Sequence, residues 1–122
     1  MDKALILVGH GAGEEAAALY RQLTEEVRER WPDTRLVMLH GEPSAEQAAA
    51  ELAAEGIRKA VILPLLLAPG HHLSKNIAAE DSGIRRAFAH AGIRTTVKNS
   101  GLLEDETVRR ELADHCIRNI SE

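Results

Sequence analysis

The chain has 122 residues, of which 44% are hydrophobic and only 2% are aromatic. This length allows one domain with one core, built mainly from aliphatic side chains. The net charge of −4 comes from interspersed acids and bases, without the basic footprint typical of nucleic-acid binding. No apolar run is long enough to span a membrane and no cleavage signal precedes the first strand, so we expect a cytoplasmic protein.

Apolar runs with strand character alternate with segments of helical periodicity along the chain. The expected strands cover Ala4–Val8, Leu36–Leu39, Ala60–Leu67 and Ile93–Lys98. The expected helices cover Glu14–Arg30, Ser44–Gly56, a stretch from Ser74 to Gly92 that Gly83 weakens, and Glu104–Asn119. Ser44 and Gln47 have the spacing of a capping box, which supports a helix start at Ser44.

This alternation predicts a single α/β domain over residues 1–122. The third strand has no polar interruption, as in a parallel strand buried on both faces. Right-handed crossovers favour a flavodoxin-like, four-stranded parallel sheet of order 2-1-3-4 with helices on both faces. In that order a crevice opens between the first and third strands, at their carboxyl ends.

Two helices carry apolar faces that we expect to pack on the domain. In the first helix this face consists of Ala16, Tyr20, Leu23 and Val27. In the last helix it consists of Val108, Leu112 and Cys116 or Ile117.

Four of the six histidines directly follow expected strands, namely His10, His40, His71 and His72. One such histidine alone is more often structural or merely exposed. Four of them at one sheet edge indicate a metal site, because neutral imidazole is the common nitrogen ligand of divalent transition metals. Two or three could hold a metal with open coordination positions. We expect His72 to point into the crevice and His71 to face solvent.

Other polar candidates are less specific. The turn Gly9–Gly13 resembles a phosphate cradle but lacks the Walker lysine and the dinucleotide-binding spacing. Its glycines would instead leave room for a bulky ligand, and its amides could receive a ligand carboxylate. Glu42 and Glu80 are candidate general bases, although each is more often a plain surface carboxylate. His115 and Cys116 are assigned to surface and packing.

Two motifs resemble those of the class II tetrapyrrole chelatases, the sirohydrochlorin cobaltochelatases and ferrochelatases with their nickel-inserting archaeal relatives. The first is a strand followed by Gly-His-Gly, in Leu5–Gly11. The second is the segment Pro64–Ile77 with its Gly-x-His motif. The loop Glu42–Ser44 also fits, and Gly101–Arg109 looks most like the anaerobic cobaltochelatase branch. The resemblance covers nearly the whole chain in order.

The resemblance implies a chelatase that inserts a divalent metal into sirohydrochlorin or a related tetrapyrrole of cobalamin or siroheme biosynthesis. Co²⁺ is the first candidate, with Fe²⁺ and Ni²⁺ as alternatives, and no ATP or other nucleotide takes part. The metal would lie on His10 and His72, which would also be the catalytic residues. The length is that of the short members, which implies a homodimer of half-enzymes.

The sequence departs from the family pattern in two places. Many members carry a glutamate in or just before the loop after the second strand, where this chain has Leu39 or His40. We expect His40 to supply a third nitrogen ligand to the metal. Asn76 also replaces a common aspartate, and Pro69 stands where His or Ala is usual. These changes leave the metal identity open.

In the implied reaction, His10 is the expected proton acceptor. The residues expected to contact the tetrapyrrole are Gly11, Ala12, Gly13, Leu39 and Lys75, with Lys75 and the three amides meeting peripheral carboxylates. A carrier that binds metal or tetrapyrrole without turnover is the alternative, which the missing glutamate favours. A flavodoxin-like or receiver-type signalling domain is disfavoured, because the first loop has no acidic pocket and few aromatics could stack a flavin.

Overall fold

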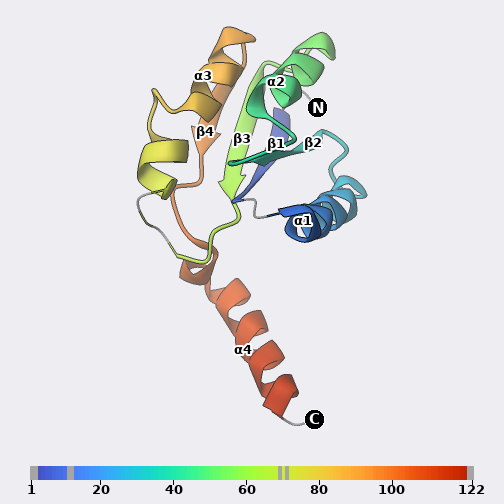
Figure 1. The fold of residues 1–122 in the computed structure, drawn as a ribbon, viewed down its shortest axis with the longest axis vertical. Coiled ribbons are helices and arrows are strands. Elements are labelled where there is room, and N and C mark those ends of the chain that lie inside the picture. The colour runs from blue at the N-terminus through green and yellow to red at the C-terminus, as the bar shows by residue number, and fades with distance from the viewer. Residues whose placement is uncertain (1–2, 11–12, 69, 71, 121–122) are drawn as a thin grey trace.

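The computed structural model describes residues 3–10, 13–68, 70 and 72–120, with only the backbone described at residues 72–74. Figure 1 shows the path of the chain. The elements are β1 (Lys3–Gly9), α1 (Gly13–Arg28), β2 (Thr34–Met38), α2 (Ala45–Ala54), β3 (Lys59–Pro64), the π-helix η1 (His72–Ala78), α3 (Gly83–His90), β4 (Arg94–Val97), the short 3₁₀ helix η2 (Leu102–Glu104) and α4 (Glu106–Ile120).

The four strands form one parallel sheet of order β2-β1-β3-β4. In the centre of the sheet, Leu7 of β1 is paired with Leu36 of β2 and with Leu63 of β3. The predicted fold class and strand order are therefore confirmed. Since all strands run the same way, their carboxyl ends share one edge of the sheet, where the loops with the strand-following histidines begin.

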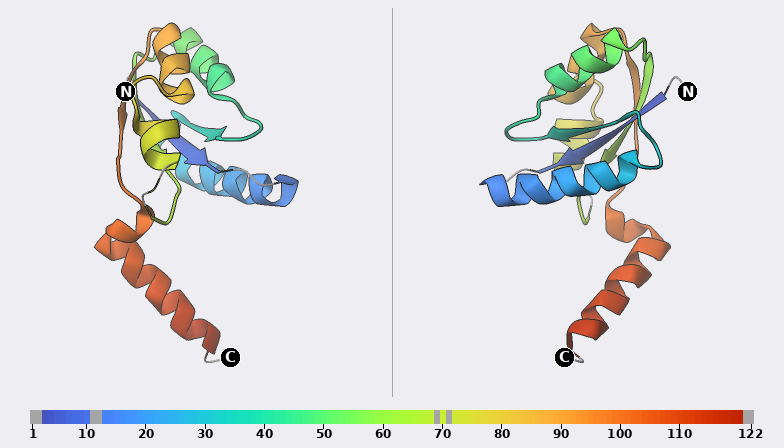
Figure 2. Two further views of the ribbon diagram at one scale, coloured as in Figure 1. Left: turned by 60° about the vertical axis from the view of Figure 1, so that its left-hand side comes forward. Right: turned by 90° about the vertical axis from the view of Figure 1, so that its right-hand side faces the viewer.

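The main core lies between the sheet and the helices α2 and α3, which pack side by side on one face (Figure 2). Alternate residues of β1 and β3 point into this core, and Leu52, Ile77 and Phe88 are completely buried. Burial of one such side chain stabilises the fold by about 1.5–3 kcal/mol. Helix α1 lies on the opposite face, against β1 and β2.

Two serine caps define where the helices of the main face begin. The Ser44 hydroxyl accepts a hydrogen bond of 3.1 Å from the Gln47 amide, as the sequence predicts for α2. The Ser82 hydroxyl accepts one of 3.2 Å from the Arg85 amide and thereby begins α3. The expected third helix is thus divided into η1 and α3. The division lies at residues 79–82, directly before Gly83, whose low helix propensity predicts a break in this region.

The predicted inner face of the first helix is partly wrong. Leu23 is 39% exposed, whereas Ala17 and Thr24 are the buried side chains of α1. The Thr24 hydroxyl is satisfied by donating to the Tyr20 carbonyl oxygen at 2.8 Å. The buried side of α1 is therefore shifted by about one residue from the predicted side. Thr24 can occupy it because its hydroxyl bonds back to a carbonyl oxygen of its own helix.

The predicted packing of the last helix onto its own domain is wrong. None of the α4 side chains, all of which the structure describes, is buried, and the helix projects away from the sheet (Figure 1). The cause lies in η2, whose Leu102 and Leu103 amides donate to the carbonyl oxygens of Leu66 and Leu67 at 2.7 and 2.8 Å. These bonds fix the direction in which α4 leaves the domain.

Among the described residues, none of the helices is both long enough and apolar enough to cross a bilayer.

We expect Phe88→Ala to lower the free energy of unfolding by about 3–5 kcal/mol, because the side chain is fully buried and leaves a cavity. Urea denaturation followed by circular dichroism measures the change. The matched control is Leu19→Ala, at a side chain that is 68% exposed, which should stay within about 0.5 kcal/mol of the parent chain. Equal effects of the two substitutions would contradict the assignment of the core.

Candidate metal and tetrapyrrole site

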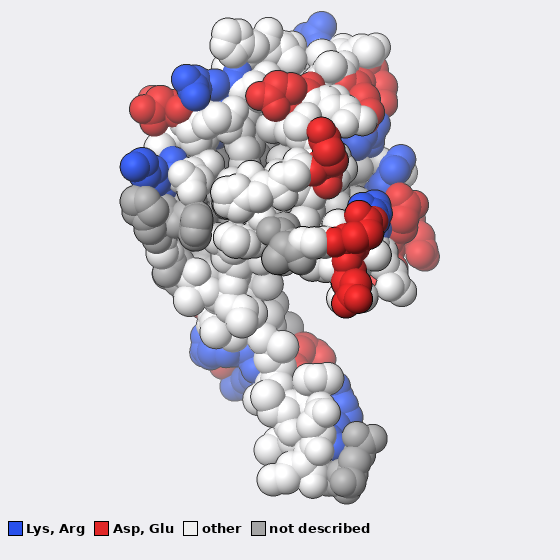
Figure 3. All heavy atoms as spheres, viewed as in Figure 1, with Lys and Arg blue, Asp and Glu red and all other residues white. Residues whose placement is uncertain are grey.

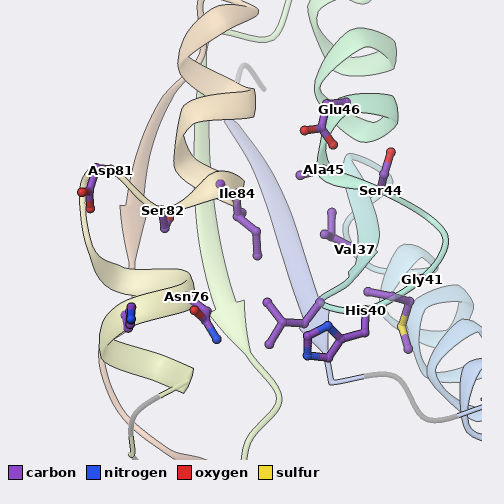
Figure 4. A pocket seen from close by; sticks show the side chains of 14 residues that line it. Val37, His40, Gly41, Ser44, Ala45, Glu46, Asn76, Asp81, Ser82 and Ile84 are labelled. Carbon is purple, nitrogen blue, oxygen red and sulfur yellow. The ribbon is translucent and has the colours of Figure 1, made fainter.

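A pocket of about 530 Å³ opens beside the carboxyl end of β2, between the start of α2 and the segment formed by η1 and the start of α3 (Figure 4). This volume lies within the range of about 300–1,000 Å³ that is usual for small-molecule sites. Apolar lining comes from Val37, Met38, Leu39 and Ile84. The polar side chains that line it are His40, Ser44, Glu46, Lys75, Asn76, Asp81 and Ser82.

The structure brings His10 and His40 together at the edge of this pocket. Strands β1 and β2 are neighbours, and the Leu39 amide donates to the Gly9 carbonyl oxygen at 2.7 Å, which continues their pairing beyond the end of β2. The two imidazole rings follow directly, with centroids 5.2 Å apart and planes at 82°. The two histidines thus lie close to each other although 30 positions separate them in the sequence.

The separation of the two rings suits a shared metal ion. A metal bonded at about 2.0–2.1 Å to a ring nitrogen lies about 3.2 Å from the ring centroid, so two ligating rings at a tetrahedral angle have centroids about 5 Å apart. The observed 5.2 Å between His10 and His40 is compatible with such sharing, and it is also an ordinary separation for two rings in edge-to-face contact. Among the described side chains, no group of three or more His, Cys, Asp or Glu is placed to hold a metal. His72, which the sequence predicts as a ligand together with His10, has its side chain outside the described residues.

The π-helix η1 forms the wall of the pocket opposite His40. Asn76 points from η1 across the pocket toward His40 (Figure 4), and Lys75 lines the same wall. Ile77 anchors η1, because its side chain is fully buried in the main core. Its carbonyl oxygen also accepts a 3.0 Å hydrogen bond from the Ser82 hydroxyl. Single turns of π-helix occur often at functional sites.

Arg85 fastens the end of η1 to the sheet. Its guanidinium donates through Nη1 to the Ala78 carbonyl oxygen at 2.9 Å, and through Nε and Nη2 to the Thr95 hydroxyl and carbonyl oxygens at 3.1 and 3.0 Å. One partly buried cation therefore links the pocket wall to the edge strand β4. Its role is to hold η1 in place, since Arg85 does not line the pocket.

Only some of the residues predicted to contact the tetrapyrrole can be placed relative to the pocket. Leu39 and Lys75 line the pocket, and Gly13 begins α1 with a φ of +87°, a conformation that favours glycine. Gly11, Ala12, Pro69 and His71 lie outside the described residues.

The two carboxylates named as candidate general bases lie outside this pocket, as expected for plain surface carboxylates. Glu42 and Glu80 are both exposed and neither lines it. Glu46 and Asp81 line it instead. Glu46 could have been found, because the first turn of a helix that follows a parallel strand lies at the carboxyl edge of the sheet. On α4, Cys116 is exposed, so its predicted packing role is wrong within this chain.

Residues 1–121 match the model of the cobalt chelatase family CbiK. The chain belongs to the CbiK cobalt chelatase family. The expected resemblance to the tetrapyrrole chelatases is thereby confirmed.

Two curated relatives of this chain are named as cobaltochelatases. This chain is 33% identical over 79 residues to the sirohydrochlorin cobaltochelatase of Methanocaldococcus jannaschii. The match covers 62% of this chain and 55% of that protein. The chain is 28% identical over 80 residues to the sirohydrochlorin cobaltochelatase CbiKC of Nitratidesulfovibrio vulgaris, covering 66% of this chain and 28% of that protein. The matched part thus spans about half or less of these relatives.

Two crystal structures resemble this chain in fold. The CbiX protein of Marinobacter aquaeolei, described as a putative cobalamin biosynthesis protein, matches with a TM-score of 0.83 at 21% identity over 98% of each chain. The sirohydrochlorin chelatase SirB of Bacillus subtilis subspecies spizizenii, solved in complex with cobalt, matches with a TM-score of 0.62 at 25% identity, covering 80% of this chain and 42% of that one.

We expect Arg85→Ala to loosen η1, because the guanidinium that ties its end to Thr95 is removed. Hydrogen exchange should become faster in residues 75–78, and the free energy of unfolding should fall by about 1–3 kcal/mol. Arg86→Ala is the matched control, because Arg86 is the exposed neighbour on the same helix. Unchanged exchange in η1 of the Arg85 variant would show that this anchor is dispensable.

Proposed function

We propose that the chain inserts a divalent metal ion into sirohydrochlorin or a related tetrapyrrole, without ATP. Co²⁺ is the first candidate, with Fe²⁺ and Ni²⁺ as alternatives. The observation that carries the proposal is the pair of imidazoles, His10 and His40, at ligand spacing beside a pocket. It is supported by the family match, by the two curated relatives named as sirohydrochlorin cobaltochelatases, and by the cobalt in the SirB complex.

The metal is a substrate in this reaction. His10, His40 and His72 would bind it through their ring nitrogens, which leaves coordination positions open for the nitrogens of the macrocycle. As the divalent ion enters, two pyrrole N–H bonds break and two protons leave, so the charge is balanced. A neutral imidazole has one basic nitrogen, so it can hold the metal or accept a proton but not both at once. We assign to His10 the acceptance of one pyrrole proton at the ring nitrogen that the metal vacates as it passes to the macrocycle, and the second proton would pass to water.

The pocket lining would orient the macrocycle. Leu39 and its apolar neighbours would contact the face of the ring, while Lys75 and the amides of residues 11–13 would meet the peripheral carboxylates. Glu46 lies on α2, across the pocket from Asn76 of η1 (Figure 4). Its negative charge would favour the approach of the cation on the His40 side and repel the carboxylates of the ring from it.

A carrier that binds metal or tetrapyrrole without turnover is the second candidate. The observation that favours it is the absence of a carboxylate at positions 39 and 40, where the chain has Leu39 and His40. We further propose that the protein acts as a homodimer, in which two such pockets are available to one assembly.

We expect His10→Ala to lower the rate of cobalt insertion by about 10²-fold or more, because a ligand and a proton acceptor are removed together. The rate is measured from the change in the absorbance spectrum of sirohydrochlorin after addition of Co²⁺. His90→Ala is the matched control, since His90 is an exposed histidine at the end of α3. Near-full activity of the His10 variant would exclude this role, and binding without accelerated insertion by the parent chain would indicate a carrier.

We expect His40→Ala to weaken binding of Co²⁺ in the absence of tetrapyrrole by at least about tenfold, because an imidazole at ligand spacing is lost. Isothermal titration calorimetry measures this affinity directly. His40→Gln keeps a polar side chain of similar size and separates the loss of a nitrogen ligand from a change in packing. If both variants bind cobalt as tightly as the parent chain, His40 is not a ligand.

A further inference from the structure

The last residue pair of the β1–β2 pairing lies directly before the two histidines of the site. Gly9 of β1 pairs with Met38 of β2, and the Leu39 amide donates to the Gly9 carbonyl oxygen at 2.7 Å. His10 follows Gly9 by one position, and His40 follows Met38 by two. The separation of the strands at this last pair therefore helps to set the separation of the two imidazoles.

The ring of Tyr20 covers Gly9 on the α1 face of the sheet. A Cβ atom added to Gly9 would stand 3.1 Å from Cδ1 and from Cδ2 of Tyr20, and 3.1 Å from the Met38 Sδ. Since the two Cδ atoms are equally distant and no other ring atom is nearer, the flat side of the ring faces Gly9. Such contacts are tighter than nine in ten Cβ contacts, so a side chain at position 9 would have to displace Tyr20 or Met38.

Tyr20 lies on the side of α1 that faces the ends of the strands. Its half-buried side chain packs against the core cluster that contains Leu7, Leu36 and Met38. Its carbonyl oxygen accepts the 2.8 Å hydrogen bond of the buried Thr24 hydroxyl. Figure 2 shows α1 across the sheet from α2 and α3, and Figure 3 shows acidic and basic side chains over the outer side of α1. The charged side of the helix thus faces solvent, which leaves the Tyr20 side against the sheet.

The ring of Tyr20, and not its hydroxyl, makes this contact. Among the residues that the structure describes, no hydrogen bond of the Tyr20 hydroxyl is found. An aromatic ring offers a large flat apolar surface for packing. Phenylalanine should therefore replace Tyr20 without loss, whereas a small side chain should not.

We infer that Tyr20 is a positioning residue for the histidine pair. Its ring lies on Gly9 and holds the ends of β1 and β2 at the separation that places the two imidazole centroids 5.2 Å apart. Met38 lies against the same position and also lines the pocket, so an obstruction at Gly9 would reach the pocket as well. The consequence for metal binding rests on the proposed function, whereas the arrangement of the two rings can be measured without metal.

The first measurement is made on the full chain without metal. In the parent chain the ring protons of His10 and His40 should show a nuclear Overhauser effect, because the two rings are in edge contact. Gly9→Ala should lose this effect, because the added Cβ forces the ring or the strand ends to move. Tyr20→Ala should lose it because the ring is absent, and Tyr20→Phe should keep it.

The second measurement is the affinity for Co²⁺ without tetrapyrrole, by isothermal titration calorimetry. Gly9→Ala and Tyr20→Ala should each weaken binding by about 10–100-fold, as is usual when a residue that orients a metal ligand is removed. Tyr20→Phe should bind as the parent chain does. The double variant should bind no more weakly than Tyr20→Ala alone, because the added Cβ then meets no ring.

Val27→Ala is the matched control, because Val27 packs against the same core cluster near the other end of α1. It should lower the free energy of unfolding and leave the Overhauser effect and the cobalt affinity unchanged. Circular dichroism checks the folding of each variant. Gly9→Ala leaves Tyr20 in place, so it tests the same contact if Tyr20→Ala does not fold.

Three outcomes would overturn the inference. The first is a parent chain without the Overhauser effect. The second is a Gly9→Ala or Tyr20→Ala variant that folds and keeps both the effect and the affinity, which would make Tyr20 an ordinary core residue. The third is a Tyr20→Phe variant that loses as much as Tyr20→Ala. If the parent chain binds no cobalt while the Overhauser effects follow the expected pattern, the proposed function fails and the positioning role of Tyr20 stands.

Discussion

The parallel pairing of β1 with β2 is the constraint on which the candidate site depends. It aligns the ends of the two strands, and the hydrogen bond from the Leu39 amide to the Gly9 carbonyl oxygen extends this alignment into the loops. The paired backbones of the two strands therefore bring His10 and His40 together. Little additional conformational entropy is lost in placing the two side chains, because the sheet already orders the backbone. A site built on strand ends keeps its spacing for as long as the sheet is intact, which suits a pair of groups that must converge on one cation.

The two walls of the pocket are built differently. The wall from β2 and α2 follows directly from strand pairing and a serine cap. The wall from η1 depends on contacts with its neighbours: a buried Ile77, the Ser82 hydroxyl and the Arg85 guanidinium that reaches to Thr95. The wall from β2 and α2 is therefore built directly on the sheet. The wall from η1 is attached to the domain by one buried apolar side chain and a few polar groups. Motion of η1 would change the width of the pocket without disturbing the pair of histidines.

The sequence predicted the sheet well because unbroken apolar runs between helices allow few arrangements. It also predicted that the strand-following histidines share an edge, since that follows from parallel strands. It could not predict the packing of α4, because periodicity shows which face of a helix is apolar and not which surface covers it. Leu23 and Thr24 show the same limit at the scale of one residue. Glu46 was missed because a carboxylate in a first helical turn is also what the helix dipole favours.

The π-helical turn of η1 also limits how this segment can change in evolution. It accommodates one more residue per turn than an α-helix would, and successive residues of an α-helix are about 100° apart around the axis. Deletion of a single residue there would restore ordinary winding and rotate Asn76 away from His40 (Figure 4). The number of residues between the end of β3 and Ser82 therefore affects which side chains η1 presents to the pocket.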